Sequence, residues 1–98
     1  RVPLNKISII QEDFFRNSKN LKNLYLNNNN NLILNDKQFT NLTSLELLDL
    51  RYCNLKTINR SMFSDLIKIN TLYLSNNIIT TIEDRSFENL SNFLETII

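Results

Sequence analysis

The amino-acid sequence repeats itself at a fixed period, which is the spacing from Leu21 to Leu45 and again from Leu45 to Ile69. When the chain is written in rows of that length, seven columns agree through three successive rows. They are Leu21/Leu45/Ile69, Leu24/Leu48/Leu72, Leu26/Leu50/Leu74, Asn29/Cys53/Asn77, Leu34/Ile58/Ile82, Phe39/Phe63/Phe87 and Leu42/Leu66/Leu90. A fixed period of this size indicates a repeat protein, in which each unit buries its apolar side chains only against its neighbours.

The period divides the chain into a single array. We expect a partial repeat at 1–20, full repeats at 21–44, 45–68 and 69–92, and a partial repeat at 93–98. Arg1 stands where a Met would open a natural chain, which predicts a processed or excised fragment. Neither end shows the polar or Cys-rich cap that a terminal repeat needs. We therefore expect missing caps and possible end-to-end self-association of the isolated fragment.

Composition excludes several classes of function. The 98 residues carry a net charge of +1, with no His, no Gly, no Trp and one Cys. Catalytic triads and Cys-His pairs need His, and phosphate-cradling loops need Gly. The longest apolar runs are far shorter than the roughly 20 residues that span a bilayer. The sequence predicts a non-enzymatic module without cofactor, metal, nucleic-acid partner or membrane insertion.

Apolar and polar residues alternate in the first part of each repeat, which is typical of a half-buried strand. We predict parallel strands at 23–27, 47–51 and 71–75. In the partial repeat before them, Val2 falls in the column of Leu26. At the other end, strict phase places Phe93, Thr96 and Ile98 in core positions, whereas a one-residue slip uses Leu94 and Ile97.

After each strand the chain must turn inward, away from water. An Asn amide both donates and accepts, so stacked Asn side chains can satisfy the turning backbone. The structural ladder is predicted at Asn5, Asn29, Cys53 and Asn77, with Cys53 as a buried, unreactive thiol. Asn31 occupies an apolar column, however. If the loop bulges by one residue, Leu32 replaces Asn31 and Asn30 becomes the ladder residue.

The segments LKNLYLNNNNN, LELLDLRYCNL and INTLYLSNNII resemble the leucine-rich repeat family, whose core is L-x-x-L-x-L-x-x-N/C-x-L. The resemblance covers essentially the whole chain. The 24-residue length, with Phe and then Leu in the second half, is similar to the typical subclass found in extracellular receptors and adhesion proteins. It implies an α/β solenoid: a right-handed coil with a short parallel sheet on the concave face and turns or short helical turns on the convex face.

The resemblance also implies a function. We expect a protein-recognition module of a secreted protein or receptor ectodomain that binds a protein ligand through the concave face. Solvent-facing strand positions supply the candidate ligand-binding residues, which are Tyr25, Asn27, Asp49, Arg51, Tyr52, Tyr73 and Ser75. Tyr and Arg are enriched at interface hot spots. The alternatives are a structural spacer or self-association surface, and an intracellular, cytoplasmic scaffold.

Three sequons for N-glycosylation occur, at Asn41, Asn59 and Asn89. The chain is so rich in Asn, Ser and Thr that chance predicts about this number. The sequons therefore give no independent indication of secretion, although each is a candidate glycan site if the chain is secreted.

Overall fold

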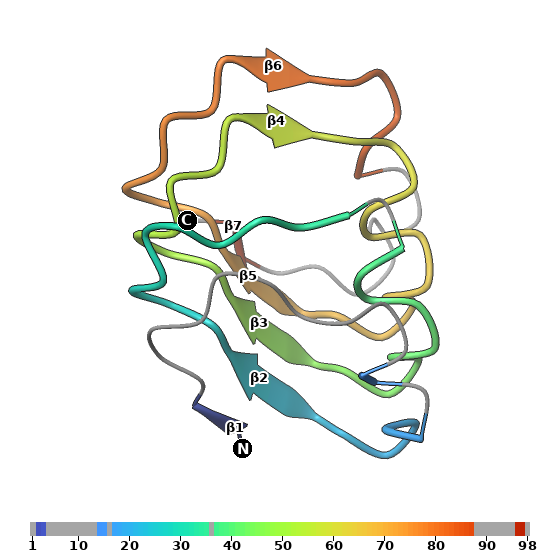
Figure 1. Cartoon of the computed structure of the whole chain (residues 1–98). Coiled ribbons are helices and arrows are strands. Elements are labelled where there is room, and N and C mark those ends of the chain that lie inside the picture. Colours follow the sequence, from blue (N-terminus) through green and yellow to red (C-terminus); the bar gives the residue numbers. More distant parts are fainter. Residues whose placement is uncertain (1, 4–13, 16, 36, 88–95, 98) are drawn as a thin grey trace.

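The computed structural model describes residues 2–3, 14–15, 17–35, 37–87 and 96–97. These ranges contain seven short strands: β1 (Val2–Pro3), β2 (Asn23–Tyr25), β3 (Leu47–Asp49), β4 (Thr57–Ile58), β5 (Thr71–Tyr73), β6 (Thr81–Ile82) and β7 (Thr96–Ile97). The chain passes from the larger sheet to a second side carrying β4 and β6, and then returns through turns (Figure 1).

Five strands form a parallel sheet in the order β1-β2-β3-β5-β7. Leu24 lies opposite Leu48, and Leu48 opposite Leu72, so the sheet register equals the sequence period. The three central strands are three residues long, shorter than predicted. Backbone hydrogen bonds between repeats nevertheless continue beyond them, since Leu26 N donates to Asp49 O (2.9 Å) and Asn28 N to Arg51 O (2.9 Å).

At the two edges of the sheet, the register departs from the strict period. Val2 lies opposite Leu24 rather than Leu26, so the column predicted for Val2 is wrong by two residues. A shift of two keeps the same alternation of faces, which is why the sequence pattern tolerates it. At the other edge Leu72 lies opposite Ile97, a spacing one residue longer than the period, which matches the one-residue slip.

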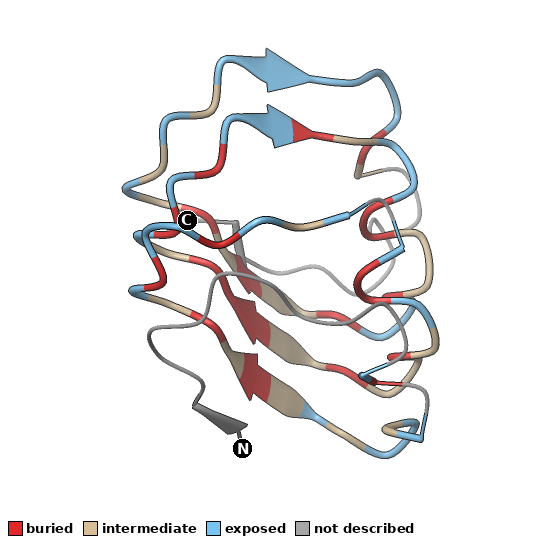
Figure 2. Ribbon diagram, viewed as in Figure 1, coloured by how far each residue is buried: buried red, intermediate tan, exposed pale blue. Residues whose placement is uncertain are grey.

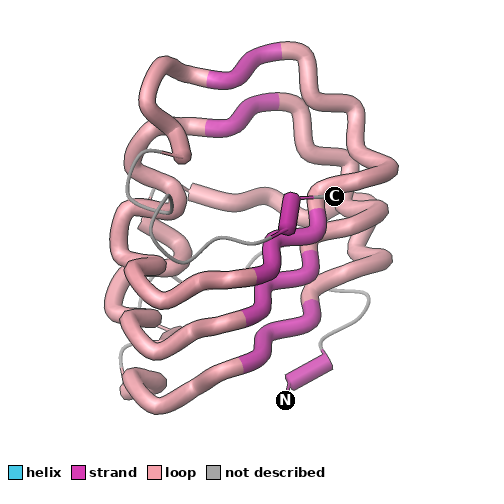
Figure 3. Tube along the Cα trace, turned by 180° about the vertical axis from the view of Figure 1, so that it is seen from behind, coloured by secondary structure: helices cyan, strands magenta, loops and turns pink. Residues whose placement is uncertain are grey.

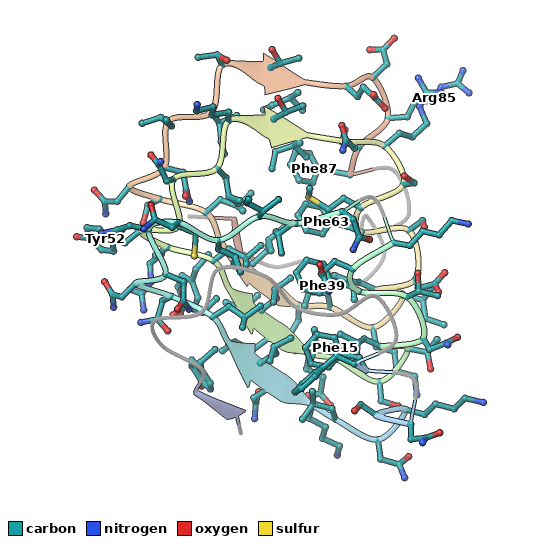
Figure 4. All side chains as sticks on the ribbon, viewed as in Figure 1. Phe15, Phe39, Tyr52, Phe63, Arg85 and Phe87 are labelled. Carbon is teal, nitrogen blue, oxygen red and sulfur yellow. The ribbon has the colours of Figure 1, made fainter. Side chains whose placement is uncertain are left out.

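The core lies between the sheet and the return turns. Leu24, Leu48 and Leu72 are fully buried beneath the sheet, and Figure 2 shows the buried positions in register from strand to strand. On the return side, four Phe rings form a column: Phe15, Phe39, Phe63 and Phe87 (Figure 4). Their successive ring centroids are 6.5, 6.3 and 6.1 Å apart. These four Phe residues therefore belong to the core, as their column predicts, whereas the adjoining Phe14 is 57% exposed.

The return segments are turns, and no helix occurs in the ranges that the structure describes (Figure 3). Hydrogen bonds from N of Gln38, Thr40 and Leu42 to the carbonyl three residues earlier recur one period later at Met62, Ser64 and Leu66. A 3₁₀-helix needs such bonds from consecutive residues. Because these bonds alternate along the chain, the turns stay separate and the predicted helical turns do not form there.

Asn77 joins the second repeat (45–68) to the third (69–92) after their strands. Its Oδ1 accepts hydrogen bonds from Cys53 N and Leu55 N, both at 3.0 Å. Its Nδ2 donates to Leu50 O and Leu74 O, both at 2.8 Å. One side chain thus satisfies backbone groups of both repeats, as the ladder requires.

Cys53 and Asn29 occupy the equivalent positions of the two preceding repeats, and Asn5 lies outside the described residues. The Cys53 thiol donates to Leu26 O (3.0 Å), and Asn29 Nδ2 donates to the same carbonyl (2.6 Å). Asn29 is buried whereas Asn30 is exposed, so the ladder residue is Asn29. Leu32 is buried, which shows that the apolar position has moved by one residue without moving the ladder.

Replacing Asn77 with Ala should lower the free energy of unfolding by about 1–3 kcal/mol, because buried backbone groups of two repeats lose their partner. Urea denaturation followed by circular dichroism measures the change. The matched control is Asn30→Ala, at an exposed position, which should stay within about 0.5 kcal/mol of the parent. Equal losses in the two variants would contradict the ladder role of Asn77.

Candidate functional site

The outward side chains of β2, β3 and β5, with the residues that immediately follow these strands, form the candidate binding surface, here called the sheet face. Tyr25 and Tyr73 are half-buried and both lie opposite Asp49 in the register. Two strand intervals separate the tyrosines, which corresponds to about 9.6 Å. The structure therefore brings together the aromatic and charged residues that the sequence places on this surface.

Asp49 was predicted to face solvent, but it is buried. The residue is 0% exposed, so the prediction that it faces solvent is wrong, while its role in ligand binding stays a prediction. The physical reason is that Arg51, two residues later on the same side of the chain, lies over it. Arg51 Nε donates to Asp49 Oδ1 at 2.9 Å, and Nη2 donates to Oδ2 at 2.6 Å.

The Arg51 guanidinium is held from two directions. Besides its bidentate contact with Asp49, its Cζ atom lies 4.7 Å from the centroid of the Tyr73 ring, within range of a cation–π interaction. The hydrogen bond to Asp49 raises the pKa of Arg51, while desolvation opposes the shift. The side chain is 40% exposed. Arg51 therefore presents a fixed positive group at the surface.

Tyr52 is exposed and its backbone is in the left-handed region, with φ of 57°. The equivalent residues of the neighbouring repeats, Asn28 and Asn76, have φ of 66° and 61°. This conformation costs ordinary L-residues roughly 1–2 kcal/mol, whereas Asn adopts it more readily. An exposed aromatic side chain thus occupies a position where the local backbone favours Asn. Figure 4 shows Tyr52 projecting on the side opposite the Phe column.

The other predicted contact residues lie beside this cluster. Asn27 and Ser75 are half-buried. Their backbone carbonyls are engaged: Ser75 O accepts from Tyr52 N at 3.4 Å, and Asn27 O from Asn29 Nδ2 at 3.5 Å. Sequence reasoning did not identify the exposed ion pair between Lys22 Nζ and Glu46 Oε2, 4.0 Å apart. Lys22 and Glu46 carry opposite charges and lie one period apart in the same column, a pattern that could have predicted this ion pair.

Cys53 is fully buried and carries a free thiol. Desolvation raises the pKa of the Cys53 thiol, a backbone hydrogen bond from Asn29 opposes the rise, and the charge of Asp49 adds to it. A buried, protonated thiol is a poor nucleophile. The geometry fits a structural role.

The sequons occupy different environments. Asn41 and Asn59 are half-buried, and Asn89 lies outside the described residues. The backbone N–H of Asn41 donates to Asp65 Oδ2 at 2.9 Å, which fixes the main chain at this sequon to the next repeat. The Asn59 sequon begins directly after β4.

In the part of the chain that the structure describes, no group of three or more His, Cys, Asp or Glu side chains could hold a metal ion. The same residues include no helix long and apolar enough to cross a membrane.

Comparison with protein families identifies the class of protein. The model of the leucine-rich repeat family matches residues 2–55 and again residues 48–94. The chain therefore belongs to the leucine-rich repeat family. Repeats of this family imply a solenoid and generally mediate protein–protein interactions, typically as non-enzymatic modules. A comparison with curated proteins gives no match.

Arg51→Ala should destabilise the fold by about 1–3 kcal/mol, because the buried carboxylate of Asp49 loses its charged partner. The double variant Asp49→Asn/Arg51→Ala should lose less than the sum of the two single losses. Denaturant titration of Arg51→Ala, Asp49→Asn and the double variant measures this coupling. Lys22→Ala is the control, since its ion pair is exposed and should contribute less than about 1 kcal/mol. Additive losses would show that the Asp49–Arg51 contact contributes little.

The raised pKa of the Cys53 thiol predicts a loss of stability at alkaline pH. Below the usual thiol value of about 8.5, both the folded and unfolded states hold the proton. As pH rises above that value, the unfolded state loses its proton first, so stability falls until the folded-state pKa is passed. Melting temperatures between pH 7 and 10 should decline more steeply for the parent than for Cys53→Ala. Rapid reaction of the native thiol with an aromatic disulfide reagent at pH 7 would contradict its burial.

Proposed function

We propose that the sheet face is a protein-recognition surface in which Tyr52 and Tyr25 supply aromatic contacts around the fixed guanidinium of Arg51. The observation that carries this proposal is Tyr52: it is 48% exposed and holds a left-handed backbone in a column otherwise occupied by Asn. Strained residues of this kind cluster at functional sites. An exposed Tyr in such a position offers a large contact surface.

The chemistry of the surface favours a neutral, hydrogen-bonding partner. Asp49 neutralises Arg51, and Glu46 lies beside Lys22, so the charges cancel in pairs. The Nη1 nitrogen of Arg51 takes no part in the two hydrogen bonds to Asp49. It can donate to a carbonyl or amide oxygen of a partner without losing its own anchor. Preorganisation of this kind lowers the entropy cost of binding.

Further features of the proposal extend beyond this site. We infer that the stacked repeats form a right-handed coil, because parallel crossover connections are almost always right-handed, and that the sheet face is concave. We propose that the chain belongs to a secreted protein or receptor ectodomain, in keeping with the resemblance to the typical 24-residue subclass. In that setting Asn41, Asn59 and Asn89 are the candidate glycan acceptors.

The size of the sheet face indicates that neighbouring repeats contribute to binding. Five strands at intervals of about 4.8 Å, each two or three residues long at about 3.3 Å per residue, give a face below about 200 Å². A standard protein interface buries about 800 Å² on each partner. A protein ligand with an interface of that size therefore contacts more than the sheet face.

The third repeat favours a second candidate function, association through its outer end. Ile58 on β4 is fully buried, whereas Ile82, its equivalent on β6, is 56% exposed. Another coil stacked beyond β6 would cover Ile82. A following repeat of a longer array or a second copy of this chain would meet that need, which corresponds to the spacer or self-association alternative.

Tyr52→Asn should separate binding from stability. Asn fits the left-handed backbone better, so the free energy of unfolding should rise by up to about 1 kcal/mol. The melting temperature should rise with it. The loss of the aromatic contact should weaken partner binding by tenfold or more, as for an interface hot spot. Immobilised parent chain is used to capture a protein partner, which is then purified and titrated against each variant by calorimetry.

Tyr25→Ala should weaken binding of the same partner. It should change the free energy of unfolding by no more than about 0.5 kcal/mol, as a typical surface substitution does. Lys37→Ala and Lys68→Ala, exposed on the return side, are the controls and should bind as the parent does. Loss of binding in the return-side variants, with the tyrosine variants unaffected, would place the recognition surface elsewhere.

A further inference from the structure

A cavity of about 480 Å³ opens between the first repeat (21–44) and the second, on the side of the molecule that carries β4 and β6. It is lined by residues 30–34 of the first repeat and by residues 54–57, Asn59 and Met62 of the second. None of these residues belongs to the sheet face. The volume lies within the range of ligand-binding clefts.

One wall of the cavity is the edge of β4. In the smaller sheet β4 pairs with β6. Four backbone hydrogen bonds join the second and third repeats here, from N of Ile78, Thr80, Thr81 and Glu83 to carbonyls of Leu55, Lys56 and Ile58. Between residues 30–34 and 54–58, all of which the structure describes, no backbone hydrogen bond forms. Because the carbonyls of Lys56 and Ile58 point toward β6, the backbone groups of Thr57 point to the opposite edge.

The ladder explains why the repeats separate at this place. Asn77 Oδ1 accepts from Cys53 N and Leu55 N, which ties the loop of the second repeat to the third. Cys53 occupies the equivalent position one repeat earlier. Its thiol accepts a hydrogen bond from the backbone of Asn29, but it has no amide oxygen to hold Asn31, the equivalent of Leu55. That loop contains the displaced apolar residue Leu32, so it cannot follow the path of its neighbour.

The lining has a consistent chemical character. Leu32, Leu55 and Met62 are buried and form an apolar floor, while Ile33 is 65% exposed at the rim. Lys56, which is exposed, is the single charged residue among those that line the cavity. Asparagine amides at the rim can pair with a peptide backbone. The cavity therefore combines apolar contact, backbone hydrogen bonding and one positive charge.

We propose that an extended peptide segment of a partner protein adds to the free edge of β4 in this cavity. Its backbone pairs with Thr57, its apolar side chains alternate into the Leu32–Leu55–Met62 floor, and an acidic side chain meets Lys56. Strand addition of this kind takes affinity from main-chain hydrogen bonds and specificity from pockets for alternate side chains. This site is independent of the proposed sheet-face function.

The probe is a synthetic heptapeptide of alternating valine and threonine with a central glutamate, titrated into the full 98-residue chain. At saturation, amide hydrogen exchange at Thr57 should slow by at least tenfold, because its N–H becomes paired. Lys56→Glu should lower the affinity for the peptide by about twofold to fivefold, as expected for one exposed ion pair. A peptide with lysine in place of glutamate should bind the parent more weakly and Lys56→Glu more tightly.

Lys68→Glu, an exposed change of the same charge outside the cavity, and Tyr25→Ala on the sheet face should leave peptide affinity unchanged. Exchange at Thr57 that stays fast with bound peptide would overturn the proposal. So would equal weakening by Lys56→Glu and Lys68→Glu. Protection of Thr57 that grows with protein concentration in the absence of peptide would also overturn it, since a second copy of the chain would then fill the cavity.

Discussion

Hydrogen bonding between backbone groups one sequence period apart is the constraint on which the rest of this structure depends. Strands of two or three residues cannot form a stable sheet alone, and each repeat becomes ordered only when its neighbour supplies partners. The apolar columns at Leu24, Leu48 and Leu72 set the register, and the ladder side chains close the gap where the chain leaves the sheet. A single amide such as Asn77 therefore stabilises two repeats at once.

That constraint leaves the outward strand positions available for recognition, and packing between repeats then arranges them. Tyr25, Asp49 and Tyr73 align because their strands pair in register, and Arg51 is drawn across the row by the buried carboxylate. The charges of the resulting surface are paired, and the Arg51 guanidinium is held by Asp49 and by the Tyr73 ring. For the binding proposed above, a donor that is already held in place favours specificity over electrostatic attraction.

Much of the architecture could be predicted from the sequence because it depends on periodicity. The seven columns predict the buried leucines, the Phe column and the parallel register of the central strands. Periodicity assigns a residue to a face, however, and not to a degree of burial. Asp49 was therefore predicted to be exposed, since the covering contact of Arg51 depends on a rotamer that no pattern records. The same limit applies to the five consecutive asparagines, where hydrogen bonding decides that Asn29 enters the ladder while Leu32 enters the core.

The unequal junctions between repeats have a mechanical consequence. The second and third repeats are joined by the larger sheet and by the β4–β6 pair, whereas the first and second are joined by the larger sheet, by the side-chain core and by the hydrogen bond from Asn41 N to Asp65 Oδ2. The joint between the first and second repeats therefore has fewer backbone hydrogen bonds than the joint between the second and third. A force that pulls apart the side carrying β4 is expected to open the first of these joints before the other. Substituting one ladder amide by a thiol thus places a less hydrogen-bonded joint within the array.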